Sequence, residues 1–462
     1  MEAREALPFM RECLKALVRA GLAACALLCA AFLPATPEQA QRPAFAALNR
    51  QFQTAMACYQ HQEYDQARSI LSGLLQQIPN SFQLNELMGL VEAAEQQPGR
   101  ASGYLGKAVR LQPASAEARM YWAATLASLH QNSRAESEFR KAVQLEPASY
   151  ETNHNLGEFY IDDRNIRGAI PYLAKAQRIR PSSPNNGYDL ALAEIKTGQY
   201  QEARADLDRL LQFHNTADIH SLLATADEKT GRYVQAANEY ELAARMSPTQ
   251  QNIFAWGSEL LLHHTLQPAV EVFERGVELY PRSAELQVGL GIALYSRTHY
   301  DQAIDAFCRA IDLNPVDPRP YEFLGKIYDV SPLQAQAVTE RFARYAQLQP
   351  HNAKALYYYG LSLWKASRTE SQSSNLTRVK TLLERAVSLD PGFAEAHFQL
   401  GVLYFQQRLF ADAIAQYRLA IGIQPSLADA HYRLGEALVR TGDRAEGRQE
   451  FQIFARLHAQ QV

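Results

Sequence analysis

One pattern recurs along most of the sequence at an interval of about 34 residues. Its clearest copy spans 394–425 and contains, in order, Leu400, Gly401, Tyr404, Ala413, Tyr417, Ala420 and Pro425. A copy 110 residues earlier contains Leu290, Gly291, Leu294, Ala303, Phe307, Ala310 and Pro315. Self-similarity at such a period is the mark of a repeat architecture, so it constrains the fold more than any other feature of the chain.

Each copy of the pattern predicts two antiparallel helices. In the first half, Leu400, Leu403 and Tyr404 recur at i, i+3 and i+4, which places them on one apolar stripe. Gly401 lies where two helices must approach closely, and Pro425 cannot continue the second helix because it lacks an N–H. A single hairpin of this kind cannot bury both stripes, so it needs neighbouring copies.

The copies can be numbered from their prolines. The prolines that close them are Pro79, Pro113, Pro147, Pro181, Pro248, Pro281, Pro315, Pro350, Pro391 and Pro425. One copy ends at Asn215 instead. We count twelve repeats, which start near residues 48, 82, 116, 150, 184, 217, 250, 284, 318, 353, 394 and 428.

The spacing of small, aromatic and proline positions resembles that of the tetratricopeptide repeat (TPR) family, from about residue 48 to 462. The resemblance implies an all-α fold, a right-handed superhelical α-solenoid of about twelve helix–turn–helix units. It also implies that the first helix of each repeat lines a concave groove, with positions 2, 5, 9 and 12 facing it. Two departures are visible: the ninth repeat needs an extra residue, and the tenth carries the insertion 366–378, which we expect to be an exposed, mobile loop containing a formal sequon at Asn375.

The first 40 residues differ from the repeats. Arg4, Arg11, Lys15 and Arg19 precede the uncharged run 20–33, whose length suits the apolar core of a signal peptide and is short for a membrane span. We therefore predict a signal peptide or N-terminal membrane anchor over 1–40 and a linker over 41–47. A secreted or periplasmic location, possibly with membrane anchoring, follows from this prediction.

Composition argues against several function classes. The net charge is −3 and no basic block is present, which disfavours nucleic-acid binding. The sequence contains no P-loop, G-x-S-x-G or H-E-x-x-H motif, so we predict no catalytic residue, no cofactor and no metal site, and hence a protein that is not an enzyme. His397 and His431 occupy equivalent places in the last two repeats and are explained by packing. Cys58 and Cys308 lie far apart and should be unpaired and buried.

The turn between the two helices of a repeat is also legible. Thr197–Gly198, Thr230–Gly231 and Thr441–Gly442 occupy equivalent places, where glycine can adopt the left-handed conformation that closes a helix. Pro98–Gly99 is interpreted as the same turn in the second repeat.

Aromatic residues at groove positions are the candidate binding site. The family geometry places Tyr295, Tyr357, Trp364, Phe398, Phe405 and Tyr432 on the inner side of the groove. Aromatic side chains provide large contact areas and often dominate binding energy, although such residues can equally fill the core between repeats. Toward the middle of the array the groove is expected to be acidic, through Glu151, Glu158, Asp218, Glu228, Glu285 and Glu322. Position 5 contains no lysine, which disfavours a clamp for a partner's C-terminal carboxylate.

These observations favour an exported, non-enzymatic scaffold that binds a peptide or helix of a protein partner in the groove. One alternative is a polysaccharide-handling or envelope-assembly subunit, in which the groove aromatics stack on sugars. The other is a regulatory subunit of a separate enzyme. The fold hosts many functions, so the sequence does not name the partner.

Overall fold

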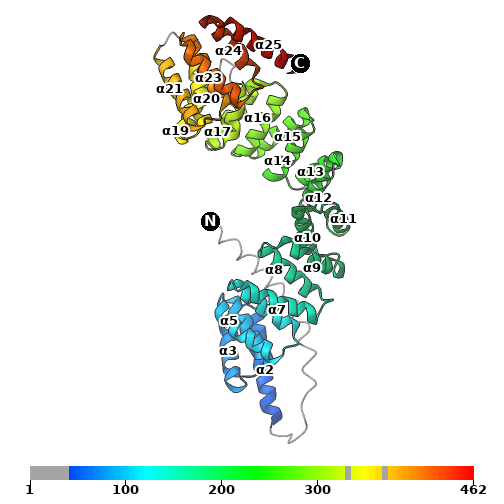
Figure 1. Cartoon of the computed structure of the whole chain (residues 1–462). Coiled ribbons are helices and arrows are strands. Elements are labelled where there is room, and N and C mark those ends of the chain that lie inside the picture. The colour runs from blue at the N-terminus through cyan, green and yellow to red at the C-terminus, as the bar shows by residue number, and fades with distance from the viewer. Residues whose placement is uncertain (1–40, 328–333, 367–372, 462) are drawn as a thin grey trace. The chain divides into compact units, whose positions relative to one another are not determined.

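The computed structural model describes residues 41–327, 334–366 and 373–461, and within these ranges the chain forms 24 helices packed in consecutive pairs (Figure 1). Each pair is one helix–turn–helix repeat, as predicted. The predicted signal or anchor, 1–40, lies outside the described residues, as does most of the connection in the ninth repeat. No described helix is both long and apolar enough to cross a membrane.

The helices form two compact bodies, which we call the N-terminal body (to Met246) and the C-terminal body (from Ser247). We call the first helix of each repeat its A helix and the second its B helix. The N-terminal body contains α2 (Gln41–Gln60), α3 (Tyr64–Gln77), α4 (Phe82–Ala94), α5 (Pro98–Leu111), α6 (Ala116–Ser128), α7 (Asn132–Leu145), α8 (Tyr150–Asp162), α9 (Ile166–Ile179), α10 (Pro184–Thr197), α11 (Tyr200–Leu211), α12 (Ala217–Lys229) and α13 (Tyr233–Met246).

The C-terminal body continues the alternation of A and B helices. It contains α14 (Gln250–Leu262), α15 (Leu266–Leu279), α16 (Ala284–Ser296), α17 (Tyr300–Leu313), α18 (Pro318–Ile327), α19 (Ala335–Leu348), α20 (Ala353–Ala366), α21 (Ser373–Leu389), α22 (Ala394–Gln406), α23 (Phe410–Ile423), α24 (Ala428–Thr441) and α25 (Arg444–Gln461).

Most helix boundaries fall where the repeat pattern places them. From the second repeat onward every A helix begins at the predicted first residue, such as Phe82 or Ala394. B helices end two residues before the closing proline, as α23 does at Ile423 before Pro425. The exception is the first repeat, where α2 begins at Gln41, so the segment 41–47 that we expected to be a linker is helical.

Two further predictions about local structure need correction. Residues 373–378 of the insertion belong to α21, so a loop over the whole of 366–378 is wrong, while 367–372 lie outside the described residues. The pair Pro98–Gly99 is not the turn of the second repeat, because Pro98 opens α5. The left-handed residue of that turn is Gln96, with φ of 59°.

In ten of the twelve repeats, all but the ninth and tenth, whose turns lie outside the described residues, the turn contains one residue in the left-handed conformation. Gly198, Gly231 and Gly442 adopt it as predicted, with φ of 84°, 78° and 100°. In seven other repeats the same position has a residue with a side chain: Gln62, Gln96, His130, Arg164, His264, Thr298 and Arg408. Because a Cβ disfavours this conformation by about 1–2 kcal/mol, packing of the two flanking helices must outweigh a local cost in those repeats.

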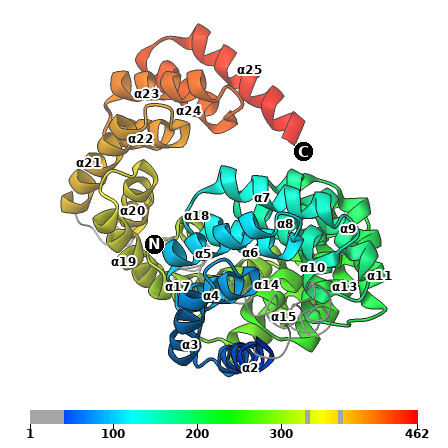
Figure 2. The same ribbon diagram turned by 90° about the horizontal axis from the view of Figure 1, so that it is seen from below.

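Neighbouring helices pack in a regular order within each body. Each B helix contacts its own A helix and the A helix of the next repeat, and consecutive A helices such as α4 and α6, or α22 and α24, also touch. Figure 2 shows that α20 and α22 lie on the inner side of the curve of the C-terminal body, while α21 and α23 lie on its outer side. The A helices therefore line the inner face.

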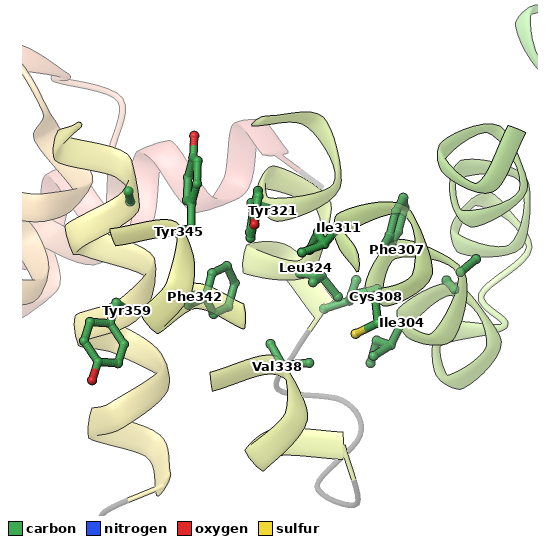
Figure 3. Packing of buried hydrophobic residues seen from close by; sticks show 14 of the residues in the cluster. Ile304, Phe307, Cys308, Ile311, Tyr321, Leu324, Val338, Phe342, Tyr345 and Tyr359 are labelled. Atoms are coloured by element: carbon green, nitrogen blue, oxygen red, sulfur yellow. The ribbon is translucent and has the colours of Figure 1, made fainter. Parts of the chain in front are cut away.

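The core is built where glycine meets a large side chain. A Cβ on Gly401 would lie 2.6 Å from the Tyr417 ring, and one on Gly157 would lie 2.5 Å from the end of Leu173. Ala413 and Ala420 are fully buried beside Tyr417, as predicted for close helix packing. In the C-terminal body the core is rich in rings, with Tyr321 and Tyr345 stacked at 4.0 Å (Figure 3).

Both described cysteines are buried and free, as predicted. Cys308 lies in the core of the C-terminal body beside Ile304 and Ile311 (Figure 3). Burial raises the pKa of the Cys308 thiol to about 11, so it is held as an unreactive thiol.

A polar side chain at position 4 of many A helices ties each helix to the turn before it. Nε2–H of His431 donates to the Pro425 carbonyl at 3.1 Å, and its Nδ1 faces Glu450 on the B helix of the same repeat. His397 makes the same two contacts, with Pro391 at 3.2 Å and Gln416 at 2.7 Å. The two histidines therefore have structural partners.

Candidate functional site

The inner face is where side chains from successive A helices meet. A recurring contact joins position 5 of one A helix to position 2 of the next. In the C-terminal body this contact is an ion pair, between Glu322 of α18 and Lys354 of α20, with Nζ and Oε1 2.7 Å apart. The same relation brings Glu117 of α6 close enough to Glu86 of α4 for its charge to raise the Glu86 pKa.

Two of the six predicted groove aromatics belong to the core. Tyr357 and Trp364 are each only 8% exposed and form part of the C-terminal apolar cluster. The Tyr357 ring packs against Phe393, with centroids 4.8 Å apart. These two side chains therefore fill the space between repeats and do not form a contact surface, which was the alternative reading of the aromatic pattern.

Tyr295 occupies an intermediate place. It is half-buried, and its ring packs against Tyr300 of the following B helix at 5.9 Å and against Phe323 of the next A helix at 5.5 Å. The contact with Tyr300 joins the end of α16 to the start of α17.

The remaining three aromatics lie on the neighbouring A helices α22 and α24, and we call them the α22–α24 patch: Phe398, Phe405 and Tyr432. Phe398 and Phe405 are half-buried, and Tyr432 is 39% exposed. Each ring rests on a ring of a B helix: Phe398 on Tyr417 at 6.0 Å, Phe405 on Phe410 at 5.3 Å, and Tyr432 on both Phe451 and Phe454 at 5.5 and 5.2 Å. Ring contacts of this kind hold the patch in place and leave part of it accessible.

In the N-terminal body the inner face is acidic. Its A helices α4 to α12 carry as cations only Arg119, Lys196 and Lys229, against the carboxylates Glu86, Glu92, Glu117, Glu151, Glu158, Asp162, Asp189, Glu194, Asp218, Asp227 and Glu228. Some of these are neutralised within the chain, as Glu151 is by Arg180, with 2.7 Å between Nη2 and Oε1. Others have no such partner.

Glu86 is a buried carboxylate, one oxygen of which has no hydrogen-bond donor. It is 9% exposed, and its Oε1 is buried without a hydrogen-bond partner. Burial, and then the charge of Glu117, raise the pKa of Glu86 to about 8. Glu117 accepts a hydrogen bond of 2.6 Å from the Tyr121 hydroxyl, whereas Glu86 has no comparable donor.

The cations packed against α4 face other carboxylates. Arg68 of α3 bonds to Glu95, which follows the end of α4, and lies 4.0 Å from Glu92, while Arg100 of α5 lies 3.9 Å from Glu92. The buried hydroxyl of Tyr121 on α6 also lies close enough to Glu86 for their charges to interact. Nothing among these groups neutralises the Glu86 carboxylate.

A second acidic group lies on α8 and α10. Glu158 is buried, and its Oε1 lies 3.1 Å from Nε2 of His154. Burial lowers the pKa of His154, but the hydrogen bond and the charge of Glu158 outweigh this and raise it. Burial, followed by the charge of Glu158, raises the pKa of Asp189 on α10 to about 6. Here one imidazole partly compensates two carboxylates.

The sequence analysis predicted an acidic inner face but did not identify the residues at which unpaired carboxylates come together. Three of the residues it named, Glu151, Glu228 and Glu322, are ion-paired, and a fourth, Glu158, faces His154. The pair Glu86 and Glu117 was not singled out, although both occupy groove positions. The signal was an acidic residue at position 5 followed by another at position 2 of the next repeat.

Catalytic and metal chemistry were also considered on the described residues. Within them, no group of three or more His, Cys, Asp or Glu side chains is arranged to hold a metal ion. The titratable groups with displaced pKa values that line the inner face are carboxylates, tyrosines and one histidine engaged with one another or with main-chain groups. This arrangement suits recognition of another molecule.

Comparison with known proteins settles the family. Tetratricopeptide repeat family models match residues 160–226, and also 255–318 and 376–428. The chain is a TPR protein. TPR arrays are protein–protein interaction scaffolds that take protein partners and are typically non-catalytic.

A curated relative of this TPR chain is the peroxisomal targeting signal receptor of Candida albicans. The two are 23% identical over 212 residues, which cover 45% of this chain and 31% of the receptor. The chain thus matches less than a third of that relative's length.

Solved structures are similar to this chain at low identity. The structure of Naa15/Naa10 bound to HypK-THB is 15% identical, with a TM-score of 0.40 and coverage of 88% of this chain and 68% of that one. The crystal structure of the APC/C hetero-tetramer Cut9-Hcn1 is 14% identical, with a TM-score of 0.38 and coverage of 89% of this chain and 94% of that one. PilF of Pseudomonas aeruginosa is 20% identical, with a TM-score of 0.38 and coverage of 45% of this chain and 95% of that one.

Proposed function

We propose that this TPR protein is a non-enzymatic scaffold, exported to the cell envelope, that binds a peptide or helix of a partner protein on the inner face of its A helices. The observation that supports this best is the α22–α24 patch. Tyr432 stays 39% exposed although its ring is braced by two B-helix rings.

Bracing and partial exposure together suit a binding surface. An aromatic ring held in place loses little conformational entropy when a partner covers it, and rings in such positions often carry much of the binding energy. Phe398 and Phe405 extend the surface along α22, so a bound segment of two to three helical turns could contact all three rings.

The proposal of export rests on the N-terminal sequence. Four basic residues precede an uncharged run of signal-peptide length, as described above. These residues lie outside the described part of the chain. Fractionation of cells producing the full chain with a C-terminal tag tests this part of the proposal, since recovery in the cytoplasmic fraction with an intact N-terminus would contradict it.

Binding is tested by substitution within the patch. Phe405→Ala and Tyr432→Ala together should reduce, by at least tenfold, the protein cross-linked to the chain in its native compartment. Phe213→Ala is the matched control, because Phe213 is 53% exposed but follows a B helix in the N-terminal body. Trp364 and Tyr357 are unsuitable because their loss would disturb the core.

The outcomes separate the proposal from its alternatives. Unchanged recovery of partner protein with an intact helical spectrum would remove the α22–α24 patch as a binding site. Titration with glycans and with peptides, followed by intrinsic fluorescence, distinguishes sugar stacking from protein binding, and turnover of a substrate by the purified chain would contradict a scaffold role.

A further inference from the structure

The ion pair Glu322–Lys354 shows what the contact between position 5 and the next position 2 can hold. There, a lysine from one A helix neutralises a glutamate from the preceding A helix, at 2.7 Å. In the N-terminal body the equivalent positions are both acidic, Glu86 and Glu117. The two positions of the repeat are the same, but in the N-terminal body neither of them carries a cation.

The missing cation leaves Glu86 in an unfavourable state. The residue is only 9% exposed, and one of its carboxylate oxygens has no hydrogen-bond partner. Its charged neighbour on α6, Glu117, has the same sign. A buried carboxylate with no partner destabilises a fold, and such costs are commonly retained where a ligand relieves them. The arrangement is therefore better explained by binding than by packing.

We propose that Glu86 and Glu117 receive one lysine or arginine side chain from a protein segment bound along the inner face of the N-terminal body. The proposal rests on the proposed scaffold function and adds the chemistry of the partner. The partner's cation takes the role that Lys354 plays toward Glu322.

Charge and shape around the pair favour this occupant. The inner face from α4 to α12 is acidic, so it attracts a basic segment and repels an acidic one. The Tyr121 hydroxyl donates a hydrogen bond of 2.6 Å to Glu117, which holds this carboxylate in place for a cation. Two carboxylates alone supply too few oxygens for a calcium ion, which takes six to eight.

A substitution within the chain can supply the missing cation. Glu117→Lys should recreate in the N-terminal body the ion pair that Lys354 makes with Glu322. It should therefore raise the unfolding midpoint of this body and at the same time block the site for a partner's cation. A rise in stability combined with a loss of binding cannot be produced by misfolding.

The experiment uses the full chain and a random 12-residue peptide phage library. Peptides that bind are resynthesised with a fluorophore, together with neutral twins in which arginine is replaced by citrulline or lysine by norleucine. Affinities are measured by fluorescence anisotropy. For the unsubstituted chain we expect the cationic peptide to bind at least tenfold more tightly than its neutral twin.

The variants decide where that preference arises. Glu86→Gln and Glu117→Lys should reduce the preference to less than twofold, while Glu322→Gln, at the equivalent position in the C-terminal body, should leave it at tenfold or more. A preference that survives in the Glu117→Lys chain overturns the proposal. Neutral twins that bind as tightly as the cationic peptides also overturn it but leave the scaffold function standing, whereas a library that yields no binder contradicts both.

Discussion

The two bodies use one packing frame to present different inner faces. In the C-terminal body the A helices α14 to α24 balance Glu259, Glu285, Glu322, Glu395, Asp429 and Glu436 with Arg319, Lys326, Lys354, Lys365, Arg433 and Arg440. In the N-terminal body carboxylates greatly outnumber cations on the corresponding helices. Because packing depends on other positions of the repeat, the inner positions are free to specialise.

The cores differ as well. Where the B helix crosses the glycine of the A helix, the N-terminal body has flexible Leu105 and Leu173 against Gly89 and Gly157, whereas the C-terminal body has the rings of Phe307 and Tyr417 against Gly291 and Gly401. A branched aliphatic chain can shift a few tenths of an ångström, but a fully enclosed ring cannot. The same repeat pattern therefore produces two cores that should differ in how well they tolerate a side chain at the glycine position.

The largest expected effect tests this contrast in the cores. Gly401→Ala should destabilise the C-terminal body by about 3 kcal/mol, since its Cβ would meet the buried Tyr417 ring at 2.6 Å. Gly157→Ala should cost the N-terminal body only about 1 kcal/mol, because Leu173 can move. Urea unfolding followed by circular dichroism compares the two, and equal losses would remove the distinction between aliphatic and aromatic cores.

The second effect concerns the inner faces and depends on pH. The raised pKa of Glu86 means that the folded state binds a proton more tightly than the unfolded state, so stability falls as pH rises from about 4.5 to about 8. Glu86→Gln removes the charge but keeps a buried polar group, and should stabilise the N-terminal body by about 2 kcal/mol at pH 8 and much less at pH 5.

Fluorescence can assign this change to one body. Trp122 lies in the N-terminal body, whereas Trp256 and Trp364 lie in the C-terminal body, so the difference between the fluorescence of chains with and without Trp122→Phe reports on the N-terminal body. Glu322→Gln is the control, because it removes an exposed ion pair worth less than about 1 kcal/mol. A stability gain from Glu86→Gln that is the same at both pH values would show that the Glu86 charge is not its source.

A third, smaller effect concerns helix capping, which differs between the N-termini of α8 and α22. Ser149 caps α8 by accepting from the Thr152 N–H at 3.3 Å, while α22 begins after Phe393 with no capping side chain. Ser149→Ala should cost about 1 kcal/mol. Thermal unfolding measures it beside Ser182→Ala, an exposed serine outside a cap, which should change stability little. No loss from Ser149→Ala would mean that packing alone fixes the start of α8.

The smallest effect should be the same in both bodies. Arg164 in the N-terminal body and Arg408 in the C-terminal body have φ of 60° and 62° at the turn of their repeats. Arg164→Gly and Arg408→Gly should each stabilise the protein by about 0.5 kcal/mol, since glycine adopts this conformation without a Cβ clash but loses more entropy on folding. Calorimetry of the two variants, with Gly198→Ala as the opposite change, tests this, and stabilisation in one body alone would show that the turns are not equivalent.

The fold was largely predictable, because the repeat pattern records packing directly. A glycine facing a ring and a proline after a helix, as at Gly401 and Pro425, are dictated by contacts within one repeat. The left-handed turn was predictable only at glycines such as Gly198, since a residue such as Arg164 carries no local sign of that conformation.

The site was less predictable, because it depends on contacts between repeats. Tyr357 occupies a groove position, but Phe393 stands where other repeats have a capping serine, and its ring covers Tyr357. The environment of Glu86 required knowing that Glu117, on another repeat, faces it and that Arg68 and Arg100 face Glu95 and Glu92 instead. A pattern averaged over repeats hides such individual neighbours.

The bond from position 4 to the closing proline sets a rule for how such an array can change in length. His397, His431, Asn85 and Asn153 each reach the carbonyl six residues earlier, so the junction between repeats is measured by one side chain. No equivalent side-chain bond fixes the length of the turn inside a repeat, and the tenth repeat carries its insertion at that turn. Foreign segments are therefore best grafted at the turns within repeats, whereas adding a single residue at a proline junction should disconnect one repeat from the next.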